Sequence, residues 1–516
     1  MTARIKERVL GEKLNAVRKA REWSPKVLEK LESLIRTGDD EELFRINPPR
    51  FAADRGIAES EAIDAFLHGA RQGMFQMEWN LVCPTCGDPV DSFRSLNKVN
   101  THFYCTVCDL SSEATLDDFI HVDFTLSPEI RDIAYHHPES LSIEDYHLKY
   151  HFNRSAAMPN GPRFIDAAPG FIKALSWLGP GQKKRFEIET TGGSITFNDM
   201  MHHLSAAVTV SGAPAEKPQP VTVRLEGGKL VPGQSVVGPG KLVFTVENRT
   251  ASRASMMILS FPPGFTRSSL VFEPFLSGKK LISIQTFREL FSTEVIQASE
   301  GIGVRDITIL FTGLQGSTAL YERIGDLKAF SLVHQHFERL GTVINEYSGV
   351  FIKTIGDAVM ASFLNPVDAV KAGLEMNKEI ARFNRAFTSR DMILKIGIHK
   401  GACIAVTLND RLDYFGQTVN TASRVQGLAG PEEIYLTDEV FSFPGVKAIL
   451  RGYKVFAGRA KLKGIQEQIP VYKVAAAPAR DGDFDLESVD AASLDAEDAA
   501  TDLKASRAPA ASKRAP

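Results

Sequence analysis

The first part of the chain carries apolar residues at helical spacing. Between Met1 and Glu78 they recur at i, i+3, i+4 and i+7, which predicts amphipathic helices. Two stripes result: Val27, Leu28, Leu31, Leu34 and Ile35, and then Ile63, Phe66 and Leu67. We expect residues 1–80 to be helical, and short helices before the strand-like GMFQMEWNLV are compatible with a degenerate winged helix. The acidic character of Ala58–Gln72 favours a packing or dimerising module over a DNA-reading helix.

Alternation of apolar and polar residues replaces the helical pattern in the middle of the chain. Phe119–Pro128 alternates as a strand, and Val221–Phe261 alternates between Gly and Pro turns, as in a small β-sandwich. Ala213–Pro220 has the composition of a loop or linker. Ile282–Val295 is helix-like, and we expect it to connect this mixed, β-rich region, residues 126–299, to the domain that follows.

A strand, a small-residue loop and a helical pattern open the last large region. The apolar strand Ile307–Phe311 is followed by a loop that leads through Gly316, Ser317 and Thr318 into an amphipathic stretch. A helix N-terminus behind such a loop presents backbone N–H groups and positive charge, so this arrangement predicts a phosphate cradle.

A β-hairpin is predicted next. Phe351–Ile355 and Ala358–Phe363 are short apolar runs around the turn pair Gly356-Asp357. The turn presents a carboxylate, with Lys353 four residues before it. Read alone, both charges also fit an ordinary turn residue and a solvated strand end.

Further polar residues recur at the spacing of one helix face. Asn420 and Arg424 are i,i+4 on a predicted helix, and Asp413 precedes them in a probable strand-turn. Asn420 would also serve as a helix N-cap and Arg424 as a surface cation. Lys463 is equally well read as a solvated strand residue.

Four of the five cysteines have the spacing of a metal site. Cys83, Cys86, Cys105 and Cys108 form C-x₂-C, eighteen residues, C-x₂-C, which is zinc-ribbon spacing. Zn²⁺ would be held by four thiolates in a closed structural site. Disulfides and free thiols are the alternatives, and disulfides suit a cytoplasmic chain poorly. The fifth, Cys403, lies in an apolar strand and is expected to be buried.

Together, these motifs resemble the catalytic domain of class III nucleotidyl cyclases over about Val304–Val474. FTGLQGST and KTIGDAVMASF are similar to the two metal-binding segments, GIHKGACIAV to a strand pair between motifs, DYFGQTVNTASR to the base-selecting and transition-state segment, and KLKGI to a late strand with a phosphate-contacting lysine. The resemblance implies a ferredoxin-like α/β domain that converts ATP to 3′,5′-cyclic AMP and pyrophosphate. The N-terminal half resembles an uncharacterised zinc-ribbon region found ahead of some bacterial cyclase domains.

The resemblance also implies a division of labour. Lys353 and Asp413 would select adenine, Asn420 would orient the ribose, and Arg424 and Lys463 would contact phosphates. Two Mg²⁺ or Mn²⁺ ions held by two aspartates would clamp the attacking and leaving oxygens.

The family pattern is broken at one metal position. Asp357 matches one of the two aspartates, but Gly313 stands at the position of the other. In this family one protomer supplies the metal carboxylates and the other supplies the base-selecting pair, so the implied unit is a head-to-tail dimer.

Composition places the chain among soluble multidomain proteins. It has 516 residues, 43% hydrophobic and 24% charged, with a net charge of −3 that gives no reason to expect nucleic acid. No apolar run is long enough to span a membrane, so we expect a cytoplasmic α+β protein. Residues 475–516 are rich in Ala, Asp and Pro and are predicted to be disordered.

Two main functions remain open. The first is an adenylate cyclase acting as a homodimer, weakened by Gly313. The second is a pseudo-cyclase that binds nucleotide or pairs with an intact cyclase. A transcription-linked sensor that uses the N-terminal helices is a weaker third.

Overall fold

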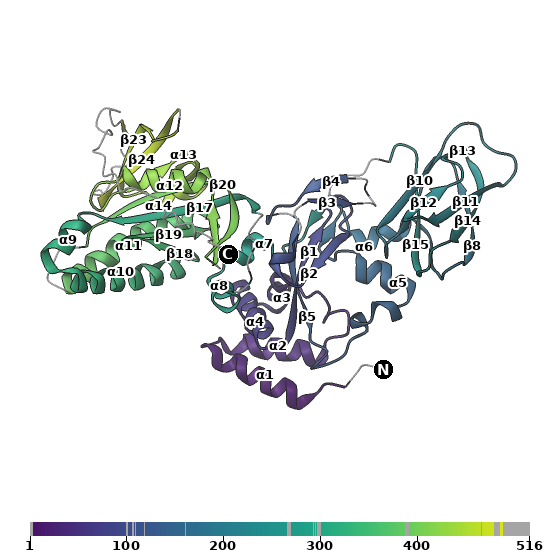
Figure 1. Ribbon diagram of the computed structural model, residues 1–516, viewed down its shortest axis with the longest axis horizontal. Helices are drawn as coiled ribbons and strands as arrows, with labels where there is room; N and C mark the ends of the chain where they lie inside the picture. Colours follow the sequence, from purple (N-terminus) through teal and green to yellow (C-terminus); the bar gives the residue numbers. More distant parts are fainter. Residues whose placement is uncertain are drawn as a thin grey trace, which may run out of the picture.

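The computed structural model describes residues 4–478, apart from 100–101, 106–107, 109, 118, 160, 266–269, 293, 295, 297–300, 387–391, 410 and 466, together with 486–488. Three regions follow one another along the long axis (Figure 1). A helical region with a small sheet lies in the middle, a β-sandwich lies at one end, and the C-terminal α/β region lies at the other.

The N-terminal helices pack on a small antiparallel sheet. They are α1 (Glu7–Ala20), α2 (Pro25–Thr37), α3 (Pro48–Arg55) and α4 (Glu59–Arg71), and the sheet has the order β2 (Pro89–Phe93), β1 (Phe75–Val82), β5 (Ile120–Leu126). The predicted stripe of α2 is buried, and Phe66 of α4 packs on Phe124 of β5 with ring centroids 5.3 Å apart. The strand predicted over Phe119–Pro128 is confirmed as β5.

The cysteine-bearing hairpins belong to this same region. The first Cys pair lies between β1 and β2. In the second pair, Cys105 ends β3 (His102–Cys105) and Cys108 lies between β3 and β4 (Leu110–Glu113). The expected domain boundary at residue 80 falls inside β1, because that strand pairs with both β2 and β5. The helices and the thiol hairpins therefore share one core.

The short helix η1 (Leu96–Lys98) lies between β2 and β3. Other short elements lie between this region and the sandwich or follow the sandwich. They are η2 (Ala134–His136), η3 (Pro138–Ser140), α5 (Ile143–Asp145), η4 (Tyr146–His151), β6 (Ala156–Ala157), α6 (Phe164–Ala167), η5 (Ala168–Gly170) and β16 (Val271–Phe272).

The β-sandwich is larger than the sequence predicted. It pairs a sheet of order β13-β10-β9-β15-β7 with one of order β12-β11-β14-β8. Its strands are β7 (Ile172–Leu178), β8 (Lys183–Thr190), β9 (Gly193–Asp199), β10 (Leu204–Val210), β11 (Gln219–Glu226), β12 (Lys229–Pro232), β13 (Val236–Val237), β14 (Gly240–Asn248) and β15 (Ala254–Phe261). The apolar inner faces meet in one core, where Phe197 and Phe244 lie 4.9 Å apart. The strands of the sandwich begin with β7 at Ile172, well before Val221, where the sequence predicted the sandwich to start.

The C-terminal region is an α/β domain around one large sheet. Its strands are β17 (Ile302–Leu314), β18 (Val350–Ile355), β19 (Ala358–Phe363), β20 (Leu394–Leu408), β21 (Arg411–Phe415), β22 (Ile434–Thr437), β23 (Tyr453–Lys461), β24 (Gln468–Pro478) and β25 (Leu486–Ser488). The order is β18-β19-β17-β20-β22-β24-β23-β25, with β21 paired to β20. Its helices are α9 (Ser317–Ile324), α10 (Asp326–Glu346), α11 (Pro366–Ala386), α12 (Gln417–Gly427), α13 (Asp438–Phe441) and α14 (Val446–Ile449).

Three expectations for this domain need correction. GIHKGACIAV belongs to the single strand β20 and not to a strand pair. The helical pattern after Ser317 is broken at Gly325, whose φ of 81° ends α9 before α10 begins. β24 runs to Pro478, into the predicted tail, and the rest of the tail, except 486–488, lies outside the described residues.

The two faces of the large sheet have different partners. Helices α10 and α11 cover one face, and α12 lies on the other (Figure 1). Because side chains alternate along a strand, Leu310 of β17 faces α10 and α11, whereas Ile309 and Phe311 join the core of the N-terminal region. The catalytic-like domain and the N-terminal region thus share one continuous apolar core.

The predicted connector helix is two short helices. They are α7 (Gly278–Ile282) and α8 (Gln285–Leu290), separated at Ser283-Ile284, and the end of the predicted stretch includes residues 293 and 295, which lie outside the described residues. Phe287 of α8 packs against Trp79 of β1, with ring centroids 5.9 Å apart. Helix α8 is therefore held between the small N-terminal sheet and the large C-terminal one.

Candidate active site

The two predicted metal positions lie at the same end of neighbouring strands. Gly313 is near the end of β17, and Asp357 is in the turn between β18 and β19. The hydroxyl of Thr312 accepts a hydrogen bond from the amide of Val359 at 3.1 Å, which ties β17 to β19 beside both positions. Asp357 is partly exposed and has no ion-pair partner among the described residues. Its position leaves the carboxylate available to a cation.

A buried histidine lies close to this turn. Burial lowers the pKa of His336 on α10 to about 4, although its bond to the carbonyl of Val333 and the nearby Asp357 act in the opposite direction. The ring is therefore neutral at physiological pH, and it places no positive charge beside the Asp357 carboxylate.

Gly313 leaves room that another side chain fills. A Cβ atom on Gly313 would lie 2.6 Å from Nε2 of Gln426, which comes from the end of α12. The amide of Gln426 thus occupies the space next to the missing carboxylate. Sequence reasoning gave Gln426 no role, and its only signal was its place two residues after Arg424 on the same helix.

The predicted base-selecting pair is assembled within one chain. Nζ of Lys353 lies 2.5 Å from Oδ2 of Asp413. The other carboxylate oxygen accepts a hydrogen bond from the amide of Tyr414 at 2.8 Å. The Asp413 side chain is 7% exposed and that of Lys353 is 36% exposed, so the carboxylate is fixed and the ammonium faces outward.

Helix α12 brings the remaining predicted residues to the sheet. Gly397 of β20 lets the helix cross at backbone contact, because a Cβ there would lie 2.1 Å from the amide nitrogen of Gln426. Asn420 is exposed and lies inside the helix, whose N-cap is Gly416, so the alternative reading of Asn420 as an N-cap is wrong.

The guanidinium of Arg424 lies against the loop that carries Lys463. A Cβ on Gly464 would lie 3.4 Å from a terminal nitrogen of Arg424. Val425 of α12 and Leu462 are buried in one small cluster, which fixes the helix against this loop. Lys463 itself is exposed, and the prediction that it lies on a strand is wrong, because β23 ends at Lys461 and β24 begins at Gln468. The two predicted phosphate-contacting cations therefore lie on neighbouring elements.

The predicted phosphate cradle has the expected backbone form. Gly316 is the N-cap of α9 with a φ of 69°, a left-handed conformation that favours glycine. Gly316 and Thr318 are exposed and Ser317 is half-buried. No contact ties these residues to the Lys353–Asp413 pair in the described structure, so their phosphate role stays a prediction.

Helix α8 holds both strands that carry the base-selecting pair. A terminal nitrogen of Arg288 donates to the carbonyl of Leu412 at 2.8 Å, and its guanidinium lies 5.4 Å from the ring centroid of Tyr414. The side chain of Gln285 accepts a hydrogen bond from the amide of Phe351 at 3.3 Å. Leu412 and Tyr414 flank Asp413, and Phe351 is two residues before Lys353.

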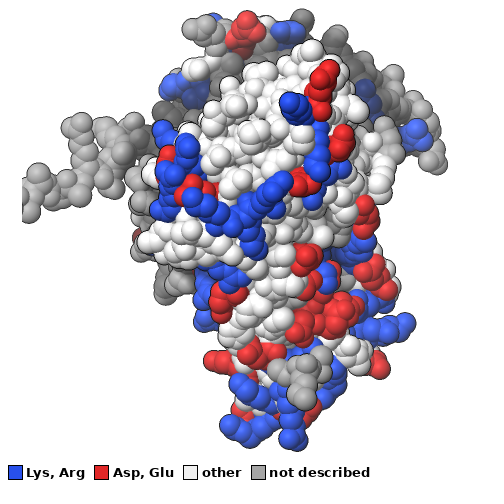
Figure 2. All heavy atoms as spheres, turned by 90° about the vertical axis from the view of Figure 1, so that its right-hand side faces the viewer, with Lys and Arg blue, Asp and Glu red and all other residues white. Residues whose placement is uncertain are grey.

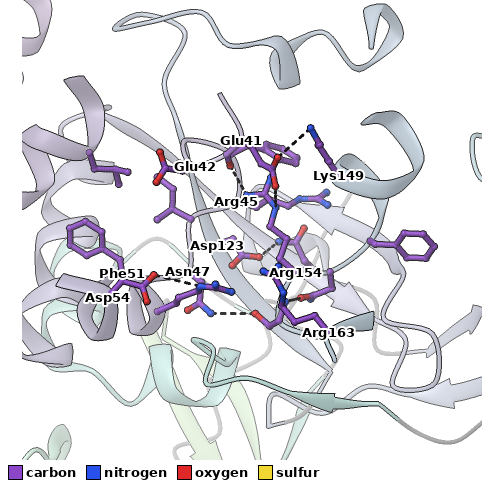
Figure 3. A pocket seen from close by; sticks show the side chains of 18 of the residues that line it. Glu41, Glu42, Arg45, Asn47, Phe51, Asp54, Asp123, Lys149, Arg154 and Arg163 are labelled. Atoms are coloured by element: carbon purple, nitrogen blue, oxygen red, sulfur yellow. Dashed lines mark hydrogen bonds and ion pairs between the residues drawn. The ribbon is translucent and has the colours of Figure 1, made fainter. Parts of the chain in front are cut away.

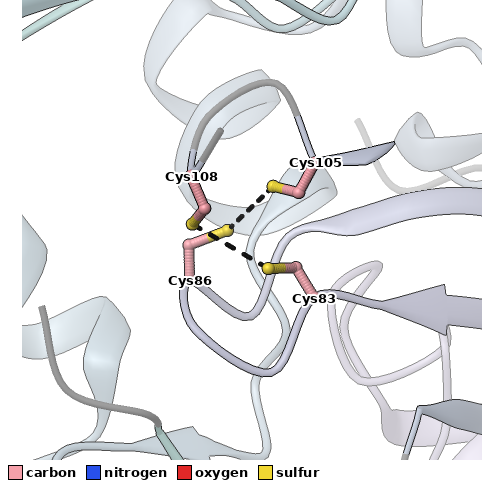
Figure 4. Close-up of side chains that lie close together, drawn as sticks. All are labelled: Cys83, Cys86, Cys105 and Cys108. Carbon is pink, nitrogen blue, oxygen red and sulfur yellow. Dashed lines mark hydrogen bonds between the residues drawn. The ribbon is translucent and has the colours of Figure 1, made fainter. Parts of the chain in front are cut away.

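The four clustered cysteines meet at one point (Figure 4). Their Sγ atoms all lie within 4.8 Å of one another, with Cys83 and Cys108 at 3.8 Å and Cys86 and Cys105 at 3.7 Å. A disulfide needs about 2.05 Å between sulfurs. Tetrahedral Zn–S bonds of about 2.3 Å place sulfurs about 3.8 Å apart. The geometry excludes disulfides here and fits a metal held by four thiolates.

The crowded thiols perturb one another. Hydrogen bonds from neighbouring cysteines, first of all Cys105, lower the pKa of Cys83 and of Cys108. The same bonds raise the pKa of Cys86 and Cys105. Cys403 lies elsewhere and is buried, as the sequence predicted. Its burial raises its pKa to about 12.

Figure 2 shows the distribution of charge on one face of the molecule. The face at the sandwich end shows Lys and Arg around a broad uncharged area, with Asp and Glu interspersed (Figure 2). None of the helices in the described part of the chain is long and apolar enough to cross a bilayer.

Two family models match the chain. Residues 10–289 match a family of unknown function, DUF5939, and residues 302–489 match the adenylate and guanylate cyclase catalytic domain.

Individual relatives resemble less than half of the chain. An adenylate cyclase of Anabaena cylindrica is 30% identical over 223 residues, covering 40% of this chain and 43% of that protein. A pH-sensitive adenylate cyclase of Mycobacterium tuberculosis is 28% identical over 212 residues, covering 38% and 48%. The chain thus spans less than half the length of these relatives. The crystal structure of the adenylyl cyclase CyaB from P. aeruginosa is 23% identical, covers 34% of this chain and 96% of that one, and has a TM-score of 0.31.

Proposed function

Because the chain belongs to the DUF5939 family and carries an adenylate and guanylate cyclase catalytic domain, we propose that it converts ATP to 3′,5′-cyclic AMP and pyrophosphate as a homodimer. The observation that supports this proposal most is the ion pair between Lys353 and Asp413. The relatives include cyclases that are named for adenylate and others that are named for guanylate, so the choice of base rests on this pair.

The pair has the hydrogen-bond polarity of an adenine site. An ammonium donates to a ring nitrogen, and a carboxylate accepts from the exocyclic amine of adenine. Guanine presents a donor and an acceptor in the opposite sense, so it would face Lys353 with a donor and Asp413 with an acceptor. The buried carboxylate of Asp413 makes such a mismatch costly, because a buried polar group without a partner costs about 1–3 kcal/mol.

The residues at the predicted metal site, Gly313 and Asp357, fit Mg²⁺ or Mn²⁺ only in part. Asp357 offers one carboxylate, and the backbone carbonyl at Gly313 is an oxygen ligand of lower charge. When bound, Mg²⁺ or Mn²⁺ supplies the positive charge that this reaction needs at the phosphates and the 3′-oxygen. The loss of one such preorganised group is worth about 3 kcal/mol, or about 10²-fold in rate. We therefore propose a weak cyclase.

Dimerisation would unite the two halves. Arg424 and Lys463 lie together on one part of the domain, and Gly313 and Asp357 lie together at strand ends. Exposed apolar side chains at Ile355, Ile404 and Phe415, which are 41%, 39% and 60% exposed, offer an uncovered surface for a second protomer. A head-to-tail pair would place the Asp357 of one protomer opposite the Arg424 of its partner.

The deciding experiment measures cyclic nucleotide formation by the full chain and by Gly313→Asp. ATP and GTP are each supplied with Mg²⁺ and with Mn²⁺, and Gly313→Asn serves as the control of equal size. We expect Gly313→Asp to form cyclic AMP about 10²-fold faster than the natural chain, since the Gln426 side chain can swing away from the new carboxylate. Inactivity of both proteins as folded dimers would refute the enzymatic proposal.

Gly313 also supports a second function. The chain would act as a pseudo-cyclase that lends Lys353, Asp413, Asn420 and Arg424 to an intact cyclase with both metal aspartates. Here the Gly313→Asp protein would be active and the natural chain would not. An intact cyclase from the same cell should then gain activity when mixed with the natural chain, and it should gain none from Arg424→Ala.

The Cys83, Cys86, Cys105 and Cys108 cluster is proposed to hold a structural Zn²⁺. Its four ligands leave no open position for catalysis, and reduced thiols agree with a cytoplasmic location.

A further inference from the structure

A polar cavity lies inside the N-terminal region, away from the catalytic domain. Its volume is about 460 Å³, within the range of small-molecule sites. Figure 3 shows charged side chains that converge on it from the two sides. They include Glu41, Arg45 and Asp54 from α3 and the segment before it, Asp123 from β5, and Lys149, Arg154 and Arg163 from the segment that begins with η4. The neutral amide of Asn47 also lines the cavity.

Two buried polar atoms at this cavity lack partners in the described part of the protein. They are one terminal nitrogen of Arg154 and Oδ1 of Asn47. Nε of Arg45 makes no hydrogen bond but lies 3.9 Å from a carboxylate oxygen of Glu78. Buried polar groups are almost always hydrogen-bonded, and a buried guanidinium nitrogen without an acceptor is costly. One guanidinium donor and one amide acceptor are therefore left for a partner from outside the chain.

The two arginines are held in place by the rest of the protein. Arg154 donates to the carbonyl of Glu41 at 2.5 Å, and Arg45 donates to the carbonyl of Tyr150 at 2.8 Å. The guanidinium of Arg45 also lies 5.0 Å from the ring centroid of Phe44. Both guanidinium groups are thus fixed in place, and the terminal nitrogen of Arg154 that has no partner is preorganised for an anion.

The backbone at Arg45 is strained. Its φ of 46° is a left-handed conformation that is uncommon for a residue with a side chain. The bond from its amide to the hydroxyl of Thr125 at 3.2 Å holds it there. Strain of this kind persists where the surrounding structure enforces it, and it is concentrated at binding sites.

The buried carboxyl group of Asp123, which lines the cavity, repels an anion only weakly. Burial raises the pKa of Asp123 to about 7, although Arg45 and Arg154 lower it. Asn80 donates to its carboxylate at 3.0 Å. At neutral pH a large share of Asp123 is protonated, so it repels an anion weakly and can donate to it.

We propose that this cavity binds a small organic anion whose carboxylate or phosphate oxygens accept a hydrogen bond from Arg154. A hydrogen-bond donor on the same ligand would satisfy Oδ1 of Asn47. The volume admits a metabolite and excludes a folded partner. This site is independent of the proposed cyclase activity.

The wall of the cavity continues toward the catalytic domain. The amide of Asn47 donates to the carbonyl of Pro274 at 2.9 Å, and Arg50 pairs with Glu273 at 2.9 Å. Residues 273–277 lead directly into α7 and α8. A ligand that fixes Asn47 thus acts on the segment that carries the α8 contacts to the base-selecting strands.

Calorimetric titration of the full chain tests the proposal. Inorganic phosphate and citrate are the probes, at matched ionic strength with chloride as the reference, and they distinguish a phosphate from a carboxylate ligand. We expect at least one probe to bind with a Kd of about 1 mM or below. Arg154→Met should weaken that binding at least about tenfold, because it removes a charge-assisted hydrogen bond. Arg249→Met, which removes an exposed arginine of the sandwich, should leave it unchanged.

A second variant protects the test against misfolding. Arg154 also holds the Glu41 carbonyl, so its replacement affects folding. Arg154→Lys keeps the positive charge and a donor for the Glu41 carbonyl but lacks the terminal nitrogen that has no partner, and it should weaken probe binding by a similar factor. Binding of neither probe to the natural chain, or equal binding by Arg154→Lys, would show that Arg154 holds no anion in this cavity and would overturn the proposal.

Discussion

The two halves of the proposed nucleotide site differ in how much of the surrounding molecule supports them. The base-selecting half is complete: Lys353 and Asp413 are bonded to each other, and α8 bonds the strands beneath both. The metal half has Asp357 in a hairpin turn and a glycine where its companion should stand. In the proposed mechanism, base selection and turnover depend on different residues, although Lys353 and Asp357 share the β18–β19 hairpin, so a substitution can remove one without the other.

The largest effect is expected from mixing defective protomers. In the Gly313→Asp background, Arg424→Ala and Asp357→Ala should each lower the rate by about 10²-fold or more. In a mixed dimer one of the two sites combines an intact metal half with an intact base half. Half of the dimers in an equal mixture are mixed, so cyclic AMP formation should return to about a quarter of the parent rate.

The control for this mixture uses two defects in the same half. Arg424→Ala mixed with Asn420→Ala should recover nothing, because no site then has an intact base half. Equal recovery in both mixtures would contradict the head-to-tail arrangement.

A smaller effect is expected on the preference for adenine over guanine. Lys353→Glu replaces a donor with an acceptor, so the ratio of ATP to GTP affinity should fall about 10- to 100-fold. Competition for a fluorescent nucleotide measures this without turnover. Lys378→Glu, on the exposed side of α11, should leave the ratio unchanged. An unchanged ratio in Lys353→Glu would remove the base-selecting role.

Loss of the metal from the thiol cluster should affect stability and not base choice. Cys86→Ser removes one of four ligands, and we expect the natural chain to contain one zinc per protomer and this variant to contain less. Its melting temperature should fall by about 5–10 °C, as should that of the natural chain after chelation. Cys403→Ser should keep its zinc. An equal zinc content in Cys86→Ser would contradict the metal site.

The smallest effect is expected at α8. Arg288→Met removes the bond to the Leu412 carbonyl and the stacking on Tyr414, so Asp413 should be held less firmly. We expect KM for ATP to rise about 3- to 10-fold with little change in kcat, since one hydrogen bond from a charged group is lost. Arg339→Met, on the far surface of α10, is the control. A change in kcat alone would show that α8 does not act through the base-selecting half.

Local sequence signals predicted the parts of the site that short segments determine. The turn at Gly356-Asp357, the helix that carries Asn420 and Arg424, and the meeting of four thiols all follow from spacing. Contacts between residues far apart in the sequence could not be predicted from the sequence. Nothing in the sequence indicated that Gln426 fills the space beside Gly313.

The limits of prediction in the N-terminal half have the same cause. The break between α7 and α8 and the extra strands of the sandwich depend on partners far away in the sequence. The Arg45 and Arg154 cavity is formed by segments about 110 residues apart, as the bond from Arg154 to Glu41 shows. Such convergence becomes visible only once the chain is folded.

The shared core also determines how the protein can be divided for study. Tyr414 is 1% exposed, and its neighbours Ser283 and Arg288 belong to the N-terminal side. A fragment that began at residue 301 would bare this ring together with Ile302 and Val304 and would leave the Leu412 carbonyl without its donor. Such a fragment should aggregate more readily and choose its nucleotide less strictly than the intact chain. Deletion analysis that treats residues 302–489 as self-sufficient would then mistake lost packing for lost regulation.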